Sequence, residues 1–162
     1  MYRTALALTS ATLMLTATTA AAQETEPPPG PPPINACGTV LEVEELKANI
    51  NERSSETGFA LTGNLVLRIS DEDSSVVVRL PGRFSVKFTE TGATVTSTGR
   101  TLLVPVDPAL AAAIARAGLP ELPLIIGRLV IKDTLDANGM PIASEITSIN
   151  GRVIDVCELL AR

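Results

Sequence analysis

Apolar and polar residues alternate in short segments along most of the chain after residue 34. In the segment 83–88, for example, Phe84, Val86 and Phe88 fall on one face of an extended strand. Successive side chains of a strand point to opposite faces, so the alternation predicts a sheet. It predicts strands at 38–43, 47–52, 58–69, 75–80, 83–89, 93–98, 100–106, 124–132, 141–149 and 152–157. We therefore expect an all-β domain, mainly an antiparallel barrel, with a sandwich as the alternative.

Turn residues separate these strands, as hairpin loops require, at 71–74, 90–92 and 136–139. The last of these loops also resembles a calcium-binding loop. Asp136, Asn138, Gly139 and Glu145 match the pattern D-x-[DN]-x-[DN]-G-x5-E. Thr134 stands where the first aspartate is required. Because Asn-Gly between two strands is also a strong hairpin signal, we predict a hairpin and no metal site.

One segment departs from the alternation and predicts a helix between Asp107 and Gly118. Asp107 can accept hydrogen bonds from free N–H groups at the helix start, and Gly118 suits a left-handed stop. Leu110 and Ile114 are four residues apart and lie on one face. The helix should therefore pack on the sheet or cover the barrel mouth as a lid. The candidate lid and ligand-binding residues are Leu110, Ile114, Leu119 and Leu122.

The two cysteines of the chain, Cys37 and Cys157, lie near the two ends of the predicted domain. In an exported protein two cysteines normally pair, and a bridge requires Cα atoms within about 7 Å. We therefore predict a disulfide that joins the start of the first strand to the end of the last. If these two strands also pair, the sheet closes into a barrel.

The N-terminal residues predict export. Residues 1–22 have the basic start, apolar middle and small-residue end of a secretory signal peptide. Residues 23–33 are rich in proline, which favours an extended spacer, and residues 34–162 form a single domain. We therefore expect a protein that is secreted or associated with the cell envelope, with no transmembrane segment in the mature chain.

The amino-acid composition argues against nucleic-acid binding and against several kinds of catalytic site. The net charge is −5, so we predict no nucleic-acid partner. The chain contains no histidine, which excludes Ser-His-Asp and Cys-His catalytic sites. No nucleotide-binding or nucleophile motif is present. We predict that the protein is not an enzyme and needs neither a cofactor nor a metal.

Gly-Arg recurs four times and predicts a repeated structural element. The dipeptides are Gly82-Arg83, Gly99-Arg100, Gly127-Arg128 and Gly151-Arg152, with Gly63-Asn64 as a looser fifth. In one interpretation, glycine permits a bend at the start of a strand and arginine covers the outer face. In another, the arginines gather around an anionic ligand.

Two stretches resemble a known group of proteins. The sequence RFSVKFTETGATVTSTGR followed by TLLVP, and the ending ITSINGRVIDVCELL, are similar to small exported proteins of unknown function from high-GC Gram-positive bacteria. The resemblance implies secretion and no activity.

Two functions are compatible with these features. The first is a secreted, non-enzymatic β-barrel domain that binds a small apolar ligand. The alternative is a structural or protein-interaction module of the cell envelope. An empty apolar pocket beneath Leu110 and Ile114 would favour the ligand binder, and a filled interior with an exposed apolar patch would favour the interaction module.

Overall fold

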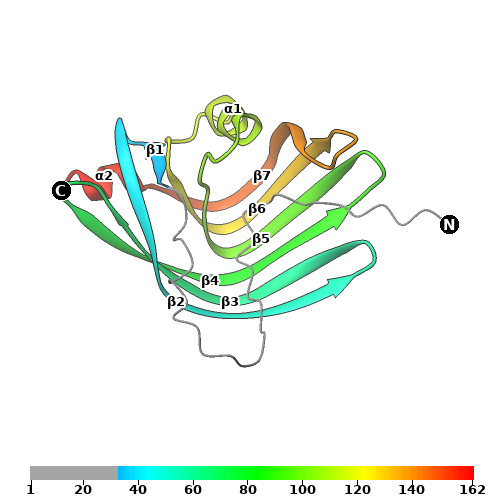
Figure 1. Ribbon diagram of the computed structural model, residues 1–162, viewed down its shortest axis with the longest axis horizontal. Helices are drawn as coiled ribbons and strands as arrows, with labels where there is room; N and C mark the ends of the chain where they lie inside the picture. Colours follow the sequence, from blue (N-terminus) through cyan, green and yellow to red (C-terminus); the bar gives the residue numbers. More distant parts are fainter. Residues whose placement is uncertain (1–32) are drawn as a thin grey trace, which may run out of the picture.

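Each strand of the sheet pairs with the strands before and after it in the chain (Figure 1). The computed structural model describes residues 33–162. Its elements are β1 (Ile34–Ala36), β2 (Thr39–Ser55), β3 (Gly58–Ser70), β4 (Ser75–Phe88), β5 (Gly92–Leu102), α1 (Pro108–Arg116), β6 (Pro123–Leu135), β7 (Pro141–Asp155) and α2 (Val156–Leu160). All pairings are antiparallel. The sheet curls into a half-barrel with α1 on its concave side, which confirms the predicted all-β class.

The strands are longer than the alternation predicted. Segments 38–43 and 47–52 form the single strand β2, 75–80 and 83–89 form β4, and 141–149 and most of 152–157 form β7. Segments 93–98 and 100–106 also join in one strand, β5, but this strand ends at Leu102, so the prediction of a strand over 103–106 is wrong. The predicted breaks fall at a bulge in β2 or at Gly-Arg dipeptides within strands. The prediction that Gly-Arg begins strands is therefore wrong.

A row of glycines crosses the sheet at these points. Gly63 pairs with Gly82, Gly82 with Gly99, Gly99 with Gly127, and Gly127 with Gly151. A Cβ atom at any of them would overlap a carbonyl oxygen of a neighbouring strand. Five strands can therefore approach closely and bend at one level, which curls the sheet. The glycines mark this bend rather than the ends of strands.

Apolar residues gather in two clusters. The first lies at the end of the domain that holds β1 and α2, and includes Ile34, Leu41, Ile69, Val78, Leu122, Leu124, Val156 and Leu160. The second lies between α1 and the sheet, and contains Leu103, Ile114, Ile125, Leu129 and Ile131. Adjacent residues Leu124 and Ile125 of β6 belong to different clusters, so the start of β6 is buried on both faces. This explains why its sequence is continuously apolar.

The disulfide is confirmed, but the barrel does not close. Cys37 and Cys157 are bridged with a Cα–Cα distance of 5.3 Å. Among residues 33–162, β1 pairs only with β2, and β7 only with β6. The last strand stops at Asp155, whose side chain accepts a hydrogen bond from the Cys157 N–H and starts α2. The expectation that Cys157 ends a strand, and closure through strand pairing, are therefore wrong.

Cys37 does not precede the first strand, as expected, but lies in the tight turn between β1 and β2. Cys37 and Gly38 both have positive φ, of 60° and 72°, as in a two-residue hairpin loop. The predicted signal peptide and all of the spacer but residue 33 lie outside the described residues. Within residues 33–162, neither helix has the length and apolar character needed to span a membrane.

Candidate functional site

The helix α1 is held at both ends by the signals that its sequence contains. The Asp107 carboxylate accepts a hydrogen bond of 2.8 Å from the Leu110 N–H. At the other end, Gly118 has a φ of 65°, and its N–H donates to the carbonyl of Ala115. The Leu119 N–H donates to the Ile114 carbonyl, which completes a Schellman motif. This motif fixes Leu119 beside Ile114.

The predicted lid residues fall in three different places. Leu110 and Ile114 pack in the second cluster, so the space beneath them is filled. Leu122 is fully buried in the first cluster. Leu119 packs against the second cluster and also faces a cleft beside the helix. The helix therefore packs on the sheet instead of covering an empty barrel.

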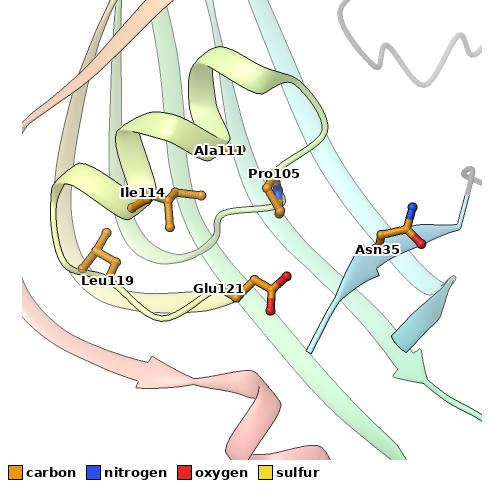
Figure 2. Close-up of a pocket in the computed structure, with 7 residues that line it drawn as sticks. Asn35, Pro105, Ala111, Ile114, Leu119 and Glu121 are labelled. Carbon is orange, nitrogen blue, oxygen red and sulfur yellow. The ribbon is translucent and has the colours of Figure 1, made fainter. Parts of the chain in front are cut away.

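A cleft of about 360 Å³ lies between α1, β1 and the segment that follows the helix (Figure 2). Its lining residues are Asn35, Pro105, Ala111, Ile114, Ala115, Leu119 and Glu121. Ile114 and Leu119, the pair joined by the Schellman motif, form an apolar wall. The volume lies within the range of small-molecule sites, about 300–1,000 Å³. Of the four predicted ligand-binding residues, the structure brings these two together in one cavity.

Two polar side chains, Asn35 and Glu121, stand at one side of the cleft (Figure 2). Oε2 of Glu121 accepts a hydrogen bond of 2.9 Å from the Cys37 N–H. This contact fixes the carboxylate, and Oε1 has no hydrogen-bond partner within residues 33–162. A carboxylate oxygen accepts hydrogen bonds and attracts cations, so this side of the cleft suits an amine or a hydroxyl group. Neither residue was predicted from the sequence.

A second, smaller cavity of about 260 Å³ lies between α1 and β7. Arg116, in the last turn of α1, donates a hydrogen bond of 2.6 Å from Nη2 to the Ser144 carbonyl. Asp133 is half-buried nearby, and this burial raises its pKa. A hydrogen bond with Ser144 opposes the increase in pKa, and the charge of Asp107 adds to it. We infer that Arg116, Ser144 and Asp133 attach α1 to the edge of the sheet.

The aromatic side chains of residues 33–162 gather on the concave face. The ring centroids of Phe59 and Phe84 are 6.2 Å apart, and those of Phe59 and Phe88 are 6.4 Å apart. All three rings are half-buried. They pack across β3 and β4 and stabilise the part of the curl that α1 does not cover.

The calcium-like segment forms the predicted hairpin. Oδ1 of Asp136 accepts hydrogen bonds of 2.8 Å from the N–H groups of Asn138 and Met140. These bonds lower the pKa of Asp136. Glu145 lies within β7 and pairs with Lys132 of β6. The carboxylate of Asp136 therefore holds the turn, and the lack of a calcium site stays a prediction.

No family model, curated protein or solved structure matches this chain. The resemblance to exported proteins of high-GC bacteria therefore stays a prediction. The function has to be argued from the cleft and the surfaces of the sheet.

Proposed function

We propose that this chain is an exported, non-enzymatic half-barrel that binds a small ligand with an apolar body and a hydrogen-bond donor. The space beneath Leu110 and Ile114, where the sequence predicted a pocket, is filled. The observation that carries the proposal is instead the cleft beside α1. Its apolar wall, formed by Ile114 and Leu119, lies opposite the carboxylate of Glu121. Sites for small molecules combine an apolar lining with a few fixed polar groups in this way.

Contacts within the chain hold both sides of the cleft in place. Hydrogen bonds at both ends of α1 hold one wall, and the Cys37 N–H holds the carboxylate of Glu121. Cys37 is itself fixed by its bond to Cys157. A ligand would therefore lose little affinity to the ordering of the site.

The disulfide is compatible with export, because such bonds persist in oxidising compartments. The predicted signal peptide provides the route, and the proline-rich spacer would separate the domain from the cleavage site. We propose that the mature protein acts outside the cytoplasm or in the cell envelope.

The first experiment fills the cleft. Ala115 lines it, whereas Ala112 is an exposed residue of α1 that does not. Ala115→Leu should weaken binding of the neutral fluorescent probe N-phenyl-1-naphthylamine by about tenfold, since added methylenes take the volume of the probe. Ala112→Leu is the matched control and should bind the probe like the wild type. Equal affinity of the two variants would contradict the proposal.

The second experiment tests the polar side. Glu121→Gln keeps an acceptor for the Cys37 N–H and removes the negative charge. It should weaken binding of the cationic probe 1-naphthylmethylammonium and leave the neutral probe unaffected. Native mass spectrometry of protein from its own culture medium would then identify a retained ligand. If neither probe binds the wild type, the structural or protein-interaction module of the cell envelope is the candidate that remains.

A further inference from the structure

The outer face of the sheet, opposite α1, carries almost all of the positive charge. Every lysine and arginine of residues 33–162 except Arg116 and Arg162 occupies an outward-facing strand position. Six of these exposed cations, all on the last four strands of the sheet, define a cationic face. This cationic face consists of Arg83, Lys87, Arg100, Arg128, Lys132 and Arg152.

The strand register arranges these cations in three rows. Arg83 and Arg128 both pair with Thr98 of β5, which lies between them. In the next row, Lys87 and Lys132 both pair with Thr94. Strands lie about 4.8 Å apart, so the backbones of the two cations of a row are about 9.6 Å apart.

The third row lies across the glycine bend. Arg100 and Arg152 both pair with Ile126 of β6. Because β5 and β7 run opposite to β4 and β6, the residue after each glycine falls on alternate sides of the bend. The repeated Gly-Arg dipeptide therefore produces a staggered array of positive charges. The sequence alone did not determine whether the four arginines lie on one face of the sheet. The strand register shows that all four occupy outward positions.

One carboxylate adjoins this array, because Glu145 of β7 pairs directly with Lys132 of β6. The outward positions of β3, β4, β5 and β6 contain no Asp or Glu, and Glu145 lies at the edge, on β7. The one salt bridge within residues 33–162 joins Arg68 to Glu44, outside the cationic face. The whole chain has a net charge of −5, so charge is strongly segregated.

We propose that the cationic face binds an acidic polysaccharide. Thr94 and Thr98 each lie between a cation of β4 and a cation of β6, and Thr96 lies between the two rows on β5. The face thus alternates positive charges with hydrogen-bonding groups, which complements a chain that carries carboxylates between hydroxyls. Arginine also forms two parallel hydrogen bonds to a carboxylate.

Other polyanions fit the face less well. The phenylalanines lie on the concave face, so the cationic face has no aromatic platform for nucleobases. Its apolar residues on β6, Ile126 and Val130, are both half-buried and offer no anchor to a bilayer. The first two rows lie on the convex side of the curl, which a flexible polymer chain can follow (Figure 1). The third row adjoins Leu102, Leu124 and Ile154, which pack in the first cluster on the same face. The proposal does not depend on the cleft, which lies on the other side of the sheet.

Titration with polygalacturonate tests the proposal. The wild type should bind it and lose affinity as salt increases, because condensed counterions are released on binding. Arg83→Gln combined with Arg128→Gln should lower the affinity at least about tenfold. The matched control, Arg79→Gln combined with Arg162→Gln, changes the net charge equally outside the array and should retain most of the affinity. Fully methyl-esterified polygalacturonate, which is uncharged, should not bind.

Several results would overturn the inference. These are equal affinities of the two double variants, equal binding of the uncharged polymer, or preference for a DNA duplex or phosphatidylglycerol vesicles. If the arginine variant does not fold, Lys87→Gln combined with Lys132→Gln provides the second test and should also weaken binding. Probe binding in the cleft should be unchanged in every folded variant of this face, so the two proposals can fail separately.

Discussion

Reduction of the Cys37–Cys157 disulfide should remove a large part of the folding free energy. The bridge joins residues 120 positions apart. In the chain-entropy model, a closed loop of this size lowers the entropy of the unfolded chain enough to stabilise the fold by about 5 kcal/mol at 25 °C. Single domains have total stabilities of about 5–15 kcal/mol. The bridge therefore contributes a third or more of the stability of the domain.

The same value predicts a shift in melting temperature. About 130 residues, at an unfolding entropy of about 2.1 cal/mol/K each, give a total of about 0.27 kcal/mol/K. A loss of about 5 kcal/mol then lowers Tm by roughly 15–20 °C. Both cysteines pack against the first apolar cluster, and we expect this packing to persist after reduction. The loss should therefore arise mainly in the unfolded state, with little change in the native fold.

Thermal unfolding followed by circular dichroism, with and without a phosphine reductant, measures this shift. Cys157→Ser should reproduce the effect of reduction. The double variant, with Cys37→Asn added to Cys157→Ser, should have nearly the same Tm as Cys157→Ser alone. The disulfide is already absent in the single variant, and asparagine tolerates the positive φ of 60° at position 37. A decrease in Tm of only two or three degrees would refute the reasoning, as would two titratable thiols in the non-reduced, exported protein.

Five further substitutions, grouped in three comparisons, test the fold. Gly127→Ala should cost roughly 3 kcal/mol or more in urea unfolding, because it combines a φ of 142° with overlap of the next strand; Gly118→Ala, with open space around it, should cost about 1–2 kcal/mol, and equal losses would contradict the close-approach argument. Ile114→Ala should cost about 2–5 kcal/mol and Leu110→Ala less, since Leu110 is half-exposed; unchanged stability in both would show that α1 does not pack on the sheet. The raised pKa of Asp133 means that its ionised form opposes folding, so stability from this group falls as pH rises through the folded pKa; Asp133→Asn should be more stable than the wild type at pH 7, with the gain shrinking in acid.

The faces of the strands and the ends of the helix depend on residues close in sequence, and the sequence predicted both correctly. Alternation placed Phe84, Val86 and Phe88 on one face, and the ends of α1 follow from Asp107 and Gly118. Strand ends were less predictable, because glycine in a single sequence indicates a turn as readily as a bend. The difference depends on whether the neighbouring strand also has glycine at the paired position. That information lies in the register between strands, which alternation alone does not determine.

The cleft could be predicted only in part for a similar reason. Ile114 and Leu119 are close in sequence, and the helix stop between them is visible there. Glu121 meets Cys37 across 84 residues, and no local pattern signals that contact. The disulfide placed Cys37 near Cys157 but gave no information on which loop would cover the turn. Contacts of this kind depend on how far the sheet curls.

The Gly-Arg repeat connects the two faces of the half-barrel. In a strand, the residue after an inward position must point outward. A glycine that bends the sheet towards α1 is therefore followed by a residue on the outer face, and in four strands that residue is arginine, as in Gly127-Arg128. Because the glycines pair across the sheet, the arginines are brought into register by the contacts that create the curvature. One repeated dipeptide therefore determines two features: the curl that buries Ile114 against the sheet, and the spacing of the cations on the outer face. A strand that slipped by one residue would disrupt both the curl and the spacing.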